Sequence, residues 1–252
     1  MTQIPTDTPV PPIQCCHVSR RFGPLLAVDD LNLSVEAGEI FCFLGPNGAG
    51  KSTTIKMLTG VLTPTAGQVI IDGQDMAKQP LKAKARVGYV PEQPFLYDKL
   101  TAVETLRFVA RLHGLSPDVA RQRGEALLNR FGLSEARHRL VEGYSHGMKQ
   151  RLAYCMALLH DPPILVADEP LVGLDPAAAR QVKDILKAKA ADEGTTIFMC
   201  THLLPVAEEL AHRVGIIHQG RLIAWEDIVS LKARYDLASE SLETLFLKLV
   251  GA

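Results

Sequence analysis

Gly45-Pro46-Asn47-Gly48-Ala49-Gly50-Lys51-Ser52-Thr53 is the stretch of this sequence that most constrains the fold. Its spacing is that of a phosphate-binding loop, G-x-x-x-x-G-K-[ST]. The apolar run Ile40–Leu44 precedes it, and apolar residues at helical spacing follow it: Ile55, Leu58 and Leu62. A loop between a buried strand and a helix start directs its backbone N–H groups and the helix dipole at one point, where an anion binds. This context favours a nucleotide site over an incidental glycine-rich turn.

The residue types in this loop suit the phosphates of ATP. Glycine at positions 45, 48 and 50 lets the backbone approach a phosphate without a Cβ in the way. Lys51 is expected to reach the β and γ phosphates, and the Ser52 hydroxyl to hold Mg²⁺. We predict that all nine residues of the stretch take part in ATP binding.

A second apolar run ends in two carboxylates. The run Ile164-Leu165-Val166-Ala167 is typical of a buried strand, and Asp168 and Glu169 follow it directly. Ligands of open parallel sheets bind at the carboxyl ends of the strands. We predict that Asp168 lies in the Mg²⁺ shell and that Glu169 orients the attacking water. Adjacent carboxylates alone would be ordinary surface charge, but downstream of a phosphate loop they predict ATP hydrolysis.

Short apolar runs rich in β-branched residues predict the strands: 14–18, 31–35, 40–44, 69–72, 87–90, 164–168, 195–200 and 214–218. Several of these runs are apolar almost throughout, which is typical of parallel strands, and we expect helices on both faces of their sheet. Leu31, Leu33 and Val35 instead alternate with polar residues, which indicates a half-exposed antiparallel strand.

Between Lys99 and Leu159 helical periodicity replaces the strand pattern, which predicts a separate helical subdomain. Thr101 and Glu104 form a capping box for its first helix. The buried stripe expected on that helix is Val103, Leu106, Val109 and Leu112. Further helices are predicted near 118–131, over 147–159, from Asp175-Pro176 onward, and as one or two amphipathic helices within 231–249.

The composition excludes several classes of protein. Lys plus Arg number 27 and Asp plus Glu 28, so the chain offers no broad basic field for nucleic acid. No window approaches the roughly 18 apolar residues of a spanning helix, and the N-terminus has no signal pattern, so we expect a cytoplasmic chain. Five scattered cysteines suit buried thiols. Residues 1–12, with four prolines, are expected to be a disordered tail.

The motif Tyr144-Ser145-His146-Gly147-Met148-Lys149-Gln150-Arg151 aligns with the Leu-Ser-Gly-Gly-Gln signature of one family. Over about residues 14–230 the chain resembles the nucleotide-binding domain of ATP-binding cassette (ABC) transporters. The resemblance implies an α/β P-loop NTPase (RecA-like) fold with a mainly parallel sheet core, an antiparallel β subdomain and an inserted α-helical subdomain. It also implies an ATPase domain over 13–230, with the insertion at about 93–160, and a C-terminal helical extension over 231–252.

The resemblance assigns roles to single residues. Phe22 would stack on adenine, and His202 would contact the γ-phosphate and the attacking water. Ser145 and the backbone N–H of Gly147 would close over the γ-phosphate bound by another protomer, so that ATP joins a head-to-tail pair. The other protomer is a second copy of the chain or a sister ATPase. The pair would act on integral membrane permease subunits from the inner face of the cell membrane.

Three places depart from the family pattern. Glu92 stands where the family has a glutamine that contacts Mg²⁺, and Gln93 follows it, so either can fill that role; Glu92 would offer a carboxylate oxygen to the metal. In the signature, His146 replaces the first glycine and adds bulk and a titratable ring near the γ-phosphate. Leu171-Val172 replaces a more polar pair beside Asp175, in the loop that couples the two sites in the family.

The form of the signature and the ending Ser241–Leu247 are most similar to the bacterial subgroup that exports drugs, lipids or polysaccharides. Two alternatives stay open at this point: a soluble ABC ATPase that does not act in transport, and a regulatory module that binds ATP without turnover. Chromosome-organising relatives need long coiled-coil insertions and a basic face, and the sequence has neither. The presence of Lys51, Asp168, Glu169 and His202 together favours turnover.

Overall fold

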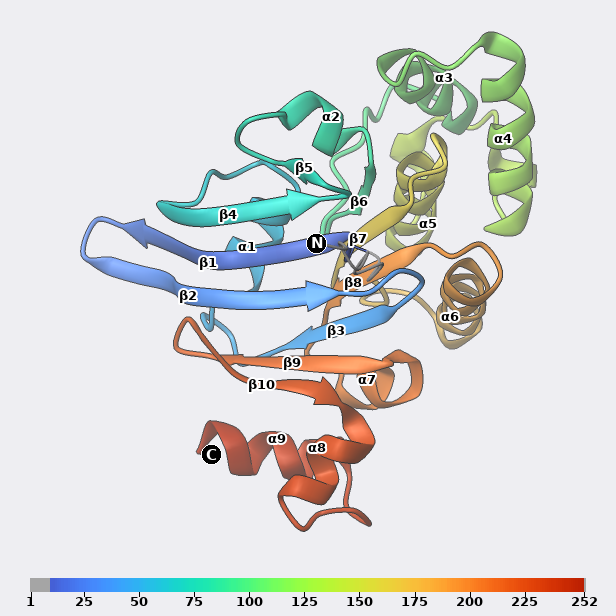
Figure 1. The fold of residues 1–252 in the computed structure, drawn as a ribbon. Helices are drawn as coiled ribbons and strands as arrows, with labels where there is room; N and C mark the ends of the chain where they lie inside the picture. Colours follow the sequence, from blue (N-terminus) through green and yellow to red (C-terminus); the bar gives the residue numbers. More distant parts are fainter. Residues whose placement is uncertain (1–9, 252) are drawn as a thin grey trace, which may run out of the picture.

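A computed structural model describes residues 10–251, and its central element is a six-stranded sheet (Figure 1). The strand order is β10-β9-β3-β8-β7-β6, and each neighbouring pair is parallel except β10 with β9. The strands are β3 (Ile40–Leu44), β6 (Val87–Val90), β7 (Ile164–Asp168), β8 (Thr196–Cys200), β9 (Arg213–His218) and β10 (Arg221–Asp227). Every residue of β3, β7 and β8 is buried, as expected for strands covered on both faces. The predicted mainly parallel core is confirmed.

A second sheet is antiparallel and has the order β2-β1-β4-β5. Its strands are β1 (Ile13–Phe22), β2 (Leu25–Val35), β4 (Ala66–Ile71) and β5 (Gln74–Asp75). Leu31, Leu33 and Val35 are buried and the residues between them are more exposed, which confirms the predicted alternation. β1 and β2 are longer than predicted, because residues 20–22 and 25–28 pair as a hairpin whose turn contains Gly23 at φ +54°.

The two faces of the parallel sheet are covered differently. Along β3, Ile40, Cys42 and Leu44 face one core, whereas Phe41 and Phe43 face the other. The first core is covered by helices, among them α6 (Pro176–Ala191), α7 (Leu204–Leu210) and those of the helical subdomain. The second is covered by α1 (Lys51–Leu58), α2 (Pro80–Lys84) and the antiparallel sheet. The expectation of helices on both faces is therefore only partly right, since the antiparallel sheet supplies most of the second cover.

The helical subdomain lies between β6 and β7 in the sequence. It contains α3 (Ala102–Leu112), α4 (Pro117–Arg130), α5 (His146–Leu158) and short 3₁₀ turns at Ser134–Ala136 and Val141–Gly143. Both hydrogen bonds of the Thr101–Glu104 capping box are present. The predicted stripe is wrong at Leu112, which is 71% exposed. The buried stripe runs through Ala102, Thr105, Leu106, Val109 and Ala110, and Leu112 lies roughly 90° around the helix from its centre.

The described chain ends in β10 and two helices, α8 (Ile228–Arg234) and α9 (Leu242–Val250), which confirms the expected C-terminal helices. The strand β10 was not predicted, because Ala224 is the only buried residue in it and its sequence contains no apolar run. Of the tail expected at 1–12, residues 1–9 lie outside the described residues. Among the helices within 10–251, none has both the length and the apolar character needed to cross a membrane.

All five cysteines are free thiols. Cys16 is half-buried, and the other four are buried, so the expectation of buried thiols holds for four: Cys15, Cys42, Cys155 and Cys200. Burial raises the pKa of Cys15 to about 12, which keeps this thiol neutral and unreactive at physiological pH.

Candidate functional site

The phosphate loop joins the carboxyl end of β3 to α1, as predicted. Gly50 immediately precedes α1 and has φ +115°, a backbone conformation that favours glycine. A Cβ on Gly50 would lie 2.6 Å from the carbonyl oxygen of Ala27 in β2, and one on Gly45 would overlap the carbonyl oxygen of Ile217 in β9. Glycine is therefore required at both positions for the loop to pass between these two strands.

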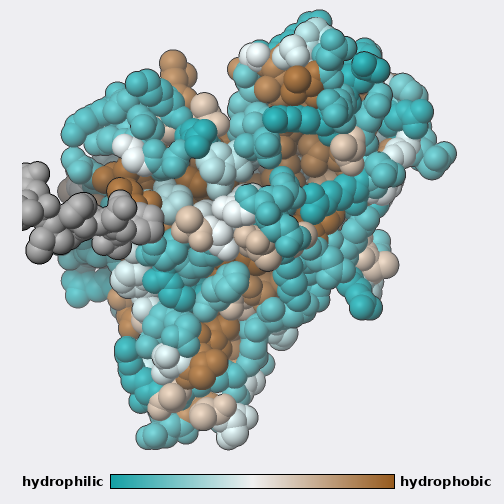
Figure 2. Space-filling view, turned by 45° about the vertical axis from the view of Figure 1, so that its right-hand side comes forward, coloured by the Kyte–Doolittle hydropathy of each residue, from teal (hydrophilic) through white to brown (hydrophobic). Residues whose placement is uncertain are grey.

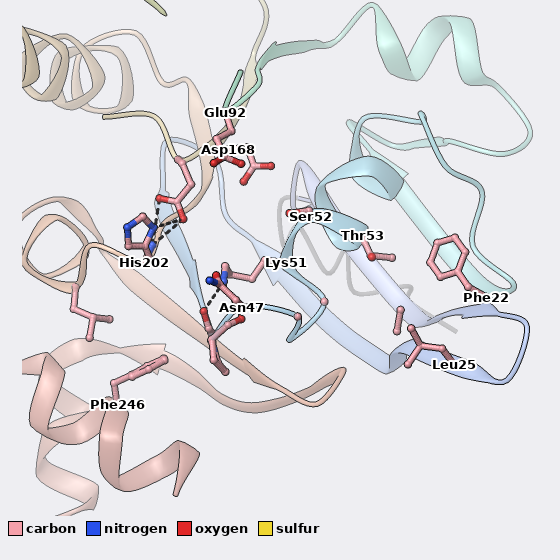
Figure 3. A pocket seen from close by; sticks show the side chains of 17 residues that line it. Phe22, Leu25, Asn47, Lys51, Ser52, Thr53, Glu92, Asp168, His202 and Phe246 are labelled. Carbon is pink, nitrogen blue, oxygen red and sulfur yellow. Dashed lines mark hydrogen bonds and ion pairs between the residues drawn. The ribbon is translucent and has the colours of Figure 1, made fainter. Parts of the chain in front are cut away.

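This loop lines a cavity of about 670 Å³ (Figure 3). Eight of the nine predicted residues line it: Gly45, Pro46, Asn47, Gly48, Gly50, Lys51, Ser52 and Thr53. Ala49 is the exception, because its side chain is buried in the core and its N–H donates to the Pro46 carbonyl at 3.2 Å. α1 has no acidic residue in its first turn, so no carboxylate of the helix itself offsets the positive end of its dipole at the cavity.

Lys51 is the first residue of α1, and its side chain is only 9% exposed. Its ammonium group donates to the carbonyl oxygens of Gly45 at 2.5 Å and Pro46 at 3.1 Å. The loop carbonyls thus hold the charge on the inner side of the loop, where it can meet the terminal phosphates of a nucleotide.

Three carboxylates face this lysine from neighbouring strand ends. Asp168 ends β7, Glu169 follows it, and Glu92 follows β6, the parallel neighbour of β7. Burial, reinforced by the charges of Glu92 and Glu169, raises the pKa of Asp168 to about 6 against the opposing effect of Lys51. The charges of Glu92 and Glu169 thus oppose the ionisation of Asp168, and a divalent cation held among these carboxylates would relieve that repulsion.

The oxygen donors in the cavity suit Mg²⁺. The Ser52 hydroxyl and the carboxylates of Asp168 and Glu92 all line it. No three His, Cys, Asp or Glu side chains within residues 10–251 are arranged to hold a metal ion by themselves. Mg²⁺ usually takes one or two protein carboxylates and completes its shell with water and substrate phosphates. Of the two candidates left open by the sequence, Glu92 lines the cavity and Gln93 does not.

Glu169 and His202 form a hydrogen-bonded pair (Figure 3). His202 Nδ1 lies 2.8 Å from Glu169 Oε1, and the His202 backbone N–H donates to the same oxygen at 3.0 Å. Glu169 has φ +46°, which is uncommon outside glycine, and its N–H donates to the Cys200 carbonyl at 2.9 Å. Backbone strain of this kind gathers at functional sites, where the surrounding structure holds it. The carboxylate is thereby fixed in the cavity wall, in position to accept a proton from a water molecule.

Phe22 lies at the rim of the cavity, in the β1–β2 hairpin and away from the carboxylates (Figure 3). Its ring is 43% exposed, and the Arg20 guanidinium lies 4.6 Å from the ring centroid. An exposed aromatic ring at this rim suits stacking on a base.

Ser145 and Gly147 lie at the start of α5 and do not line the cavity. The Ser145 hydroxyl instead accepts a hydrogen bond from the Met148 N–H at 3.3 Å and caps the helix. The structure therefore brings together every predicted site residue except Ala49 and these two signature residues.

Four residues that line the cavity were not predicted: Leu25, Ala27, Leu204 and Phe246. They come from β2, α7 and α9, which are ordinary strands and helices in sequence. Apolar residues in such elements belong to no motif, so only the folded chain places them here.

The comparisons with known proteins agree with this geometry. The family described as ABC transporter matches residues 28–172. The chain is 39% identical over 222 residues, 88% of its length, to the bacitracin transport ATP-binding protein BcrA of Bacillus licheniformis, and it covers 72% of that protein. A solved ATP binding subunit of an ABC transporter matches with a TM-score of 0.89 and 33% identity, over 94% of this chain and 98% of that one. The dimeric ATP-binding cassette MJ0796 in a post-hydrolysis state with ADP and Pi matches with a TM-score of 0.80 and 26% identity, over 86% and 98%.

Proposed function

Because the chain belongs to the ABC transporter family, as an ATP-hydrolysing subunit of exporter type, we propose that it works in a head-to-tail pair that uses Mg-ATP to drive export through separate integral membrane permease subunits. The observation that carries this proposal is the convergence in one cavity of the phosphate loop, Asp168 and the hydrogen-bonded Glu169–His202 pair. A module that only bound ATP would have no use for a fixed carboxylate–imidazole pair, which disfavours the idle regulatory alternative.

The phosphate loop grips the nucleotide. Backbone N–H groups of the loop and of the first turn of α1 meet the phosphates, and Lys51 reaches the β and γ groups. Phe22 stacks on the adenine at the rim. Ser52, Asp168 and Glu92 are the residues that would hold Mg²⁺, which when bound neutralises phosphate charge and orients the terminal oxygens.

Hydrolysis depends on the Glu169–His202 pair, whose members follow β7 and β8. Glu169 orients the attacking water and accepts its proton. His202 fixes the Glu169 carboxylate through its Nδ1 and through its backbone N–H. Its ring is 56% exposed, so the remaining ring nitrogen is available to the γ-phosphate.

A second protomer completes the site. Ser145 and the Gly147 N–H lie at a helix start that has no acidic residue in its first turn, so they can close on the γ-phosphate held by the partner. The partner is a second copy of this chain or a sister ATPase, and a dimeric relative in a post-hydrolysis state supports such a pair. Loss of the shared γ-phosphate would loosen the pair and produce the motion that is passed to the membrane.

The helical insertion is the proposed docking region for the permease subunits. We assign residues 13–230 to the ATPase domain, with the insertion at about 93–160, and 231–252 to a C-terminal extension. Several large apolar side chains of the insertion are exposed: Phe95, Tyr97, Phe108 and Leu112. Figure 2 shows an apolar patch among hydrophilic residues where the helical subdomain lies. Exposed apolar patches of this kind mark interaction sites. Docking there would hold the chain on the inner face of the cell membrane, with no role for nucleic acid.

Glu169→Gln tests the proposal, because the amide keeps the size of the side chain but cannot accept a proton. We expect kcat to fall by about 10²-fold or more while ATP affinity stays within about twofold. The ATP-bound pair should accumulate and be visible by size-exclusion chromatography with light scattering. Glu240→Gln, at an exposed position, is the matched control. Hydrolysis by Glu169→Gln at the parental rate would remove the role given to this carboxylate.

A further inference from the structure

The histidine that replaces the first signature glycine packs on a neighbouring loop of its own chain. His146 is the first residue of α5, and its ring lies directly on Gly173. A Cβ added to Gly173 would overlap the ring carbon Cδ2 and lie 2.5 Å from Nε2. The exposed His146 ring would have to turn away to make room, while the φ of +78° at Gly173 favours glycine in its own right. The bulk that His146 brings is thus directed at Gly173 within the same chain.

Two other side chains of α5 hold loops of the nucleotide site. His146, Gln150 and Tyr154 are four residues apart and form one stripe of the helix. The buried Tyr154 hydroxyl donates to the carbonyl of Pro170 at 3.2 Å, and the Gln150 amide donates to the carbonyl of Pro91 at 3.4 Å. Pro170 follows Glu169 and Pro91 precedes Glu92, so this stripe of α5 contacts both loops that carry the proposed site carboxylates.

The loop on which His146 rests is short and internally hydrogen-bonded. It runs from Glu169 to Asp175, the N-cap of α6. The Val172 N–H donates to the Glu169 carbonyl at 3.2 Å, and the Leu174 N–H donates to the Leu171 carbonyl at 3.4 Å. A displacement at Gly173 therefore reaches Glu169, whose own backbone is already in a strained conformation.

We propose that His146 is a positioning residue for hydrolysis, whose ring, seated on Gly173, fixes the 169–175 loop and with it the direction of the Glu169 carboxylate. This inference rests on the proposed role of Glu169. Ser145 and Gly147 flank His146. A nucleotide that the partner holds at the start of α5 therefore affects the position of the His146 ring, and through it the loop that carries Glu169 of the same chain. His146 and Gly173 then form a matched pair, in which a change at one alters the effect of a change at the other.

A double-mutant cycle tests the pairing. In Gly173→Ala the new Cβ displaces the ring, and we expect kcat to fall by about tenfold or more with the ATP affinity unchanged. His146→Gly removes the ring, and we expect kcat to fall by about three- to tenfold, because the loop is freed rather than displaced. In the double variant the clash is gone, so kcat should return to within about threefold of the His146→Gly value. The strain of alanine at positive φ is the same whether Gly173→Ala is made in the parent or in His146→Gly, so it cancels when the two effects on kcat are compared.

Gly73→Ala is the matched control for the cycle. Gly73 has φ +73°, close to that of Gly173, but a Cβ there would meet nothing within 4 Å. Its effect on kcat should be small and independent of His146. Additive effects in the Gly173 cycle, or the same non-additivity in the Gly73 cycle, would overturn the proposal.

Hydrogen exchange provides a second measurement that does not depend on the recovery of Gly173→Ala. In His146→Gly the amides of Val172 and Leu174 should exchange several-fold faster, while amides near Gly73 should not change. Unchanged exchange at 172 and 174 would also overturn the proposal. Glu169→Gln is measured in the same assays. If it stalls hydrolysis and the cycle is additive, only the coupling of His146 to Gly173 is refuted. If Glu169→Gln hydrolyses ATP normally, the proposed role of Glu169 is itself refuted.

Discussion

Under the proposed function, two helix starts of this chain meet the same ligand group, a phosphate, in different ways. The starts of α1 and α5 both lack an acidic residue in the first turn, so each presents free N–H groups and the positive end of a dipole. At α1 the buried Lys51 and the carboxylates of Asp168, Glu169 and Glu92 surround the position in a cavity. At α5 the neighbouring groups are a hydroxyl and a histidine on an exposed surface. On this proposal the first region binds a nucleotide within one chain, whereas the second acts on a nucleotide that another chain brings to it.

The largest expected effect lies in the first region. Lys51→Ala removes a buried charge that the phosphates would meet, and we expect kcat/KM for ATP to fall by about 10³-fold, mainly through lost binding. Titration with a fluorescent ATP analogue measures the affinity directly. Lys56→Ala, at an exposed position on the same helix, controls for the loss of a nearby positive charge. An unchanged ATP titration of Lys51→Ala would mean that the loop does not bind phosphate.

The next largest effect is expected from a change at the start of α5, the second region. Gly147→Glu places an anion at the start of α5, and we expect about 10²-fold slower hydrolysis with unchanged ATP binding to the single chain. Within the chain, a Cβ at Gly147 would lie 3.4 Å from the Gly173 carbonyl oxygen, an ordinary contact. Gly147→Ala is therefore the steric control.

Mixing the two inactive variants tests whether the regions belong to different chains. In a head-to-tail pair each site combines Lys51 of one chain with Gly147 of the other. A pair of one Lys51→Ala chain with one Gly147→Glu chain therefore has one site that carries both changes and one site that carries neither. Random mixing should then restore about a quarter of the parental activity. No recovery, with pairs demonstrated by light scattering, would show that the two regions do not meet across an interface.

The same contrast explains which parts of the site can be predicted from the sequence. Lys51, Asp168 and Glu169 are identifiable because a glycine spacing or an apolar strand immediately precedes them, and β3 and β7 are buried throughout. His202 also follows a buried strand, β8, but a single histidine there forms no motif, and Phe22 has no motif around it either, so both were assigned through resemblance to a family. Leu204 and Phe246 are carried by helices whose patterns report only core packing, so tertiary structure alone brings them to the cavity. The contact of His146 with Gly173 is equally invisible, because it joins positions 27 residues apart that no periodicity relates.

A smaller effect concerns the stability of the first region. The pKa of Asp168 in the folded chain, about 6, is above its ordinary value, so the folded state holds this proton more tightly than the unfolded state. The stabilising contribution is therefore complete below about pH 4 and is lost as the pH rises through about 6. Asp168→Asn should raise the unfolding free energy of the nucleotide-free chain by about 1–3 kcal/mol near pH 8 and by almost nothing near pH 4.

Urea unfolding at the two pH values, with Asp184→Asn as a control at an exposed position in α6, measures this difference. The same Asp168→Asn variant should lose hydrolysis, so stability and activity would change in opposite directions. Equal stability of Asp168→Asn and the parent near pH 8 would contradict a raised pKa of the buried Asp168 carboxyl.

The smallest expected effect concerns α9 in the C-terminal extension, and its measurement tests whether this helix belongs to the nucleotide cavity at the start of α1. Phe246 of α9 lines the cavity but is also packed against the core, so its apolar contact with a nucleotide can be only partial. Phe246→Ala should therefore change ATP affinity by no more than about threefold, or ~0.7 kcal/mol, with Leu247→Ala on the exposed side of α9 as control. A tenfold or greater loss in Phe246→Ala alone would make α9 part of the nucleotide site. The first region would then be built from both ends of the chain, because the extension would supply a wall of the cavity opposite the β1–β2 hairpin.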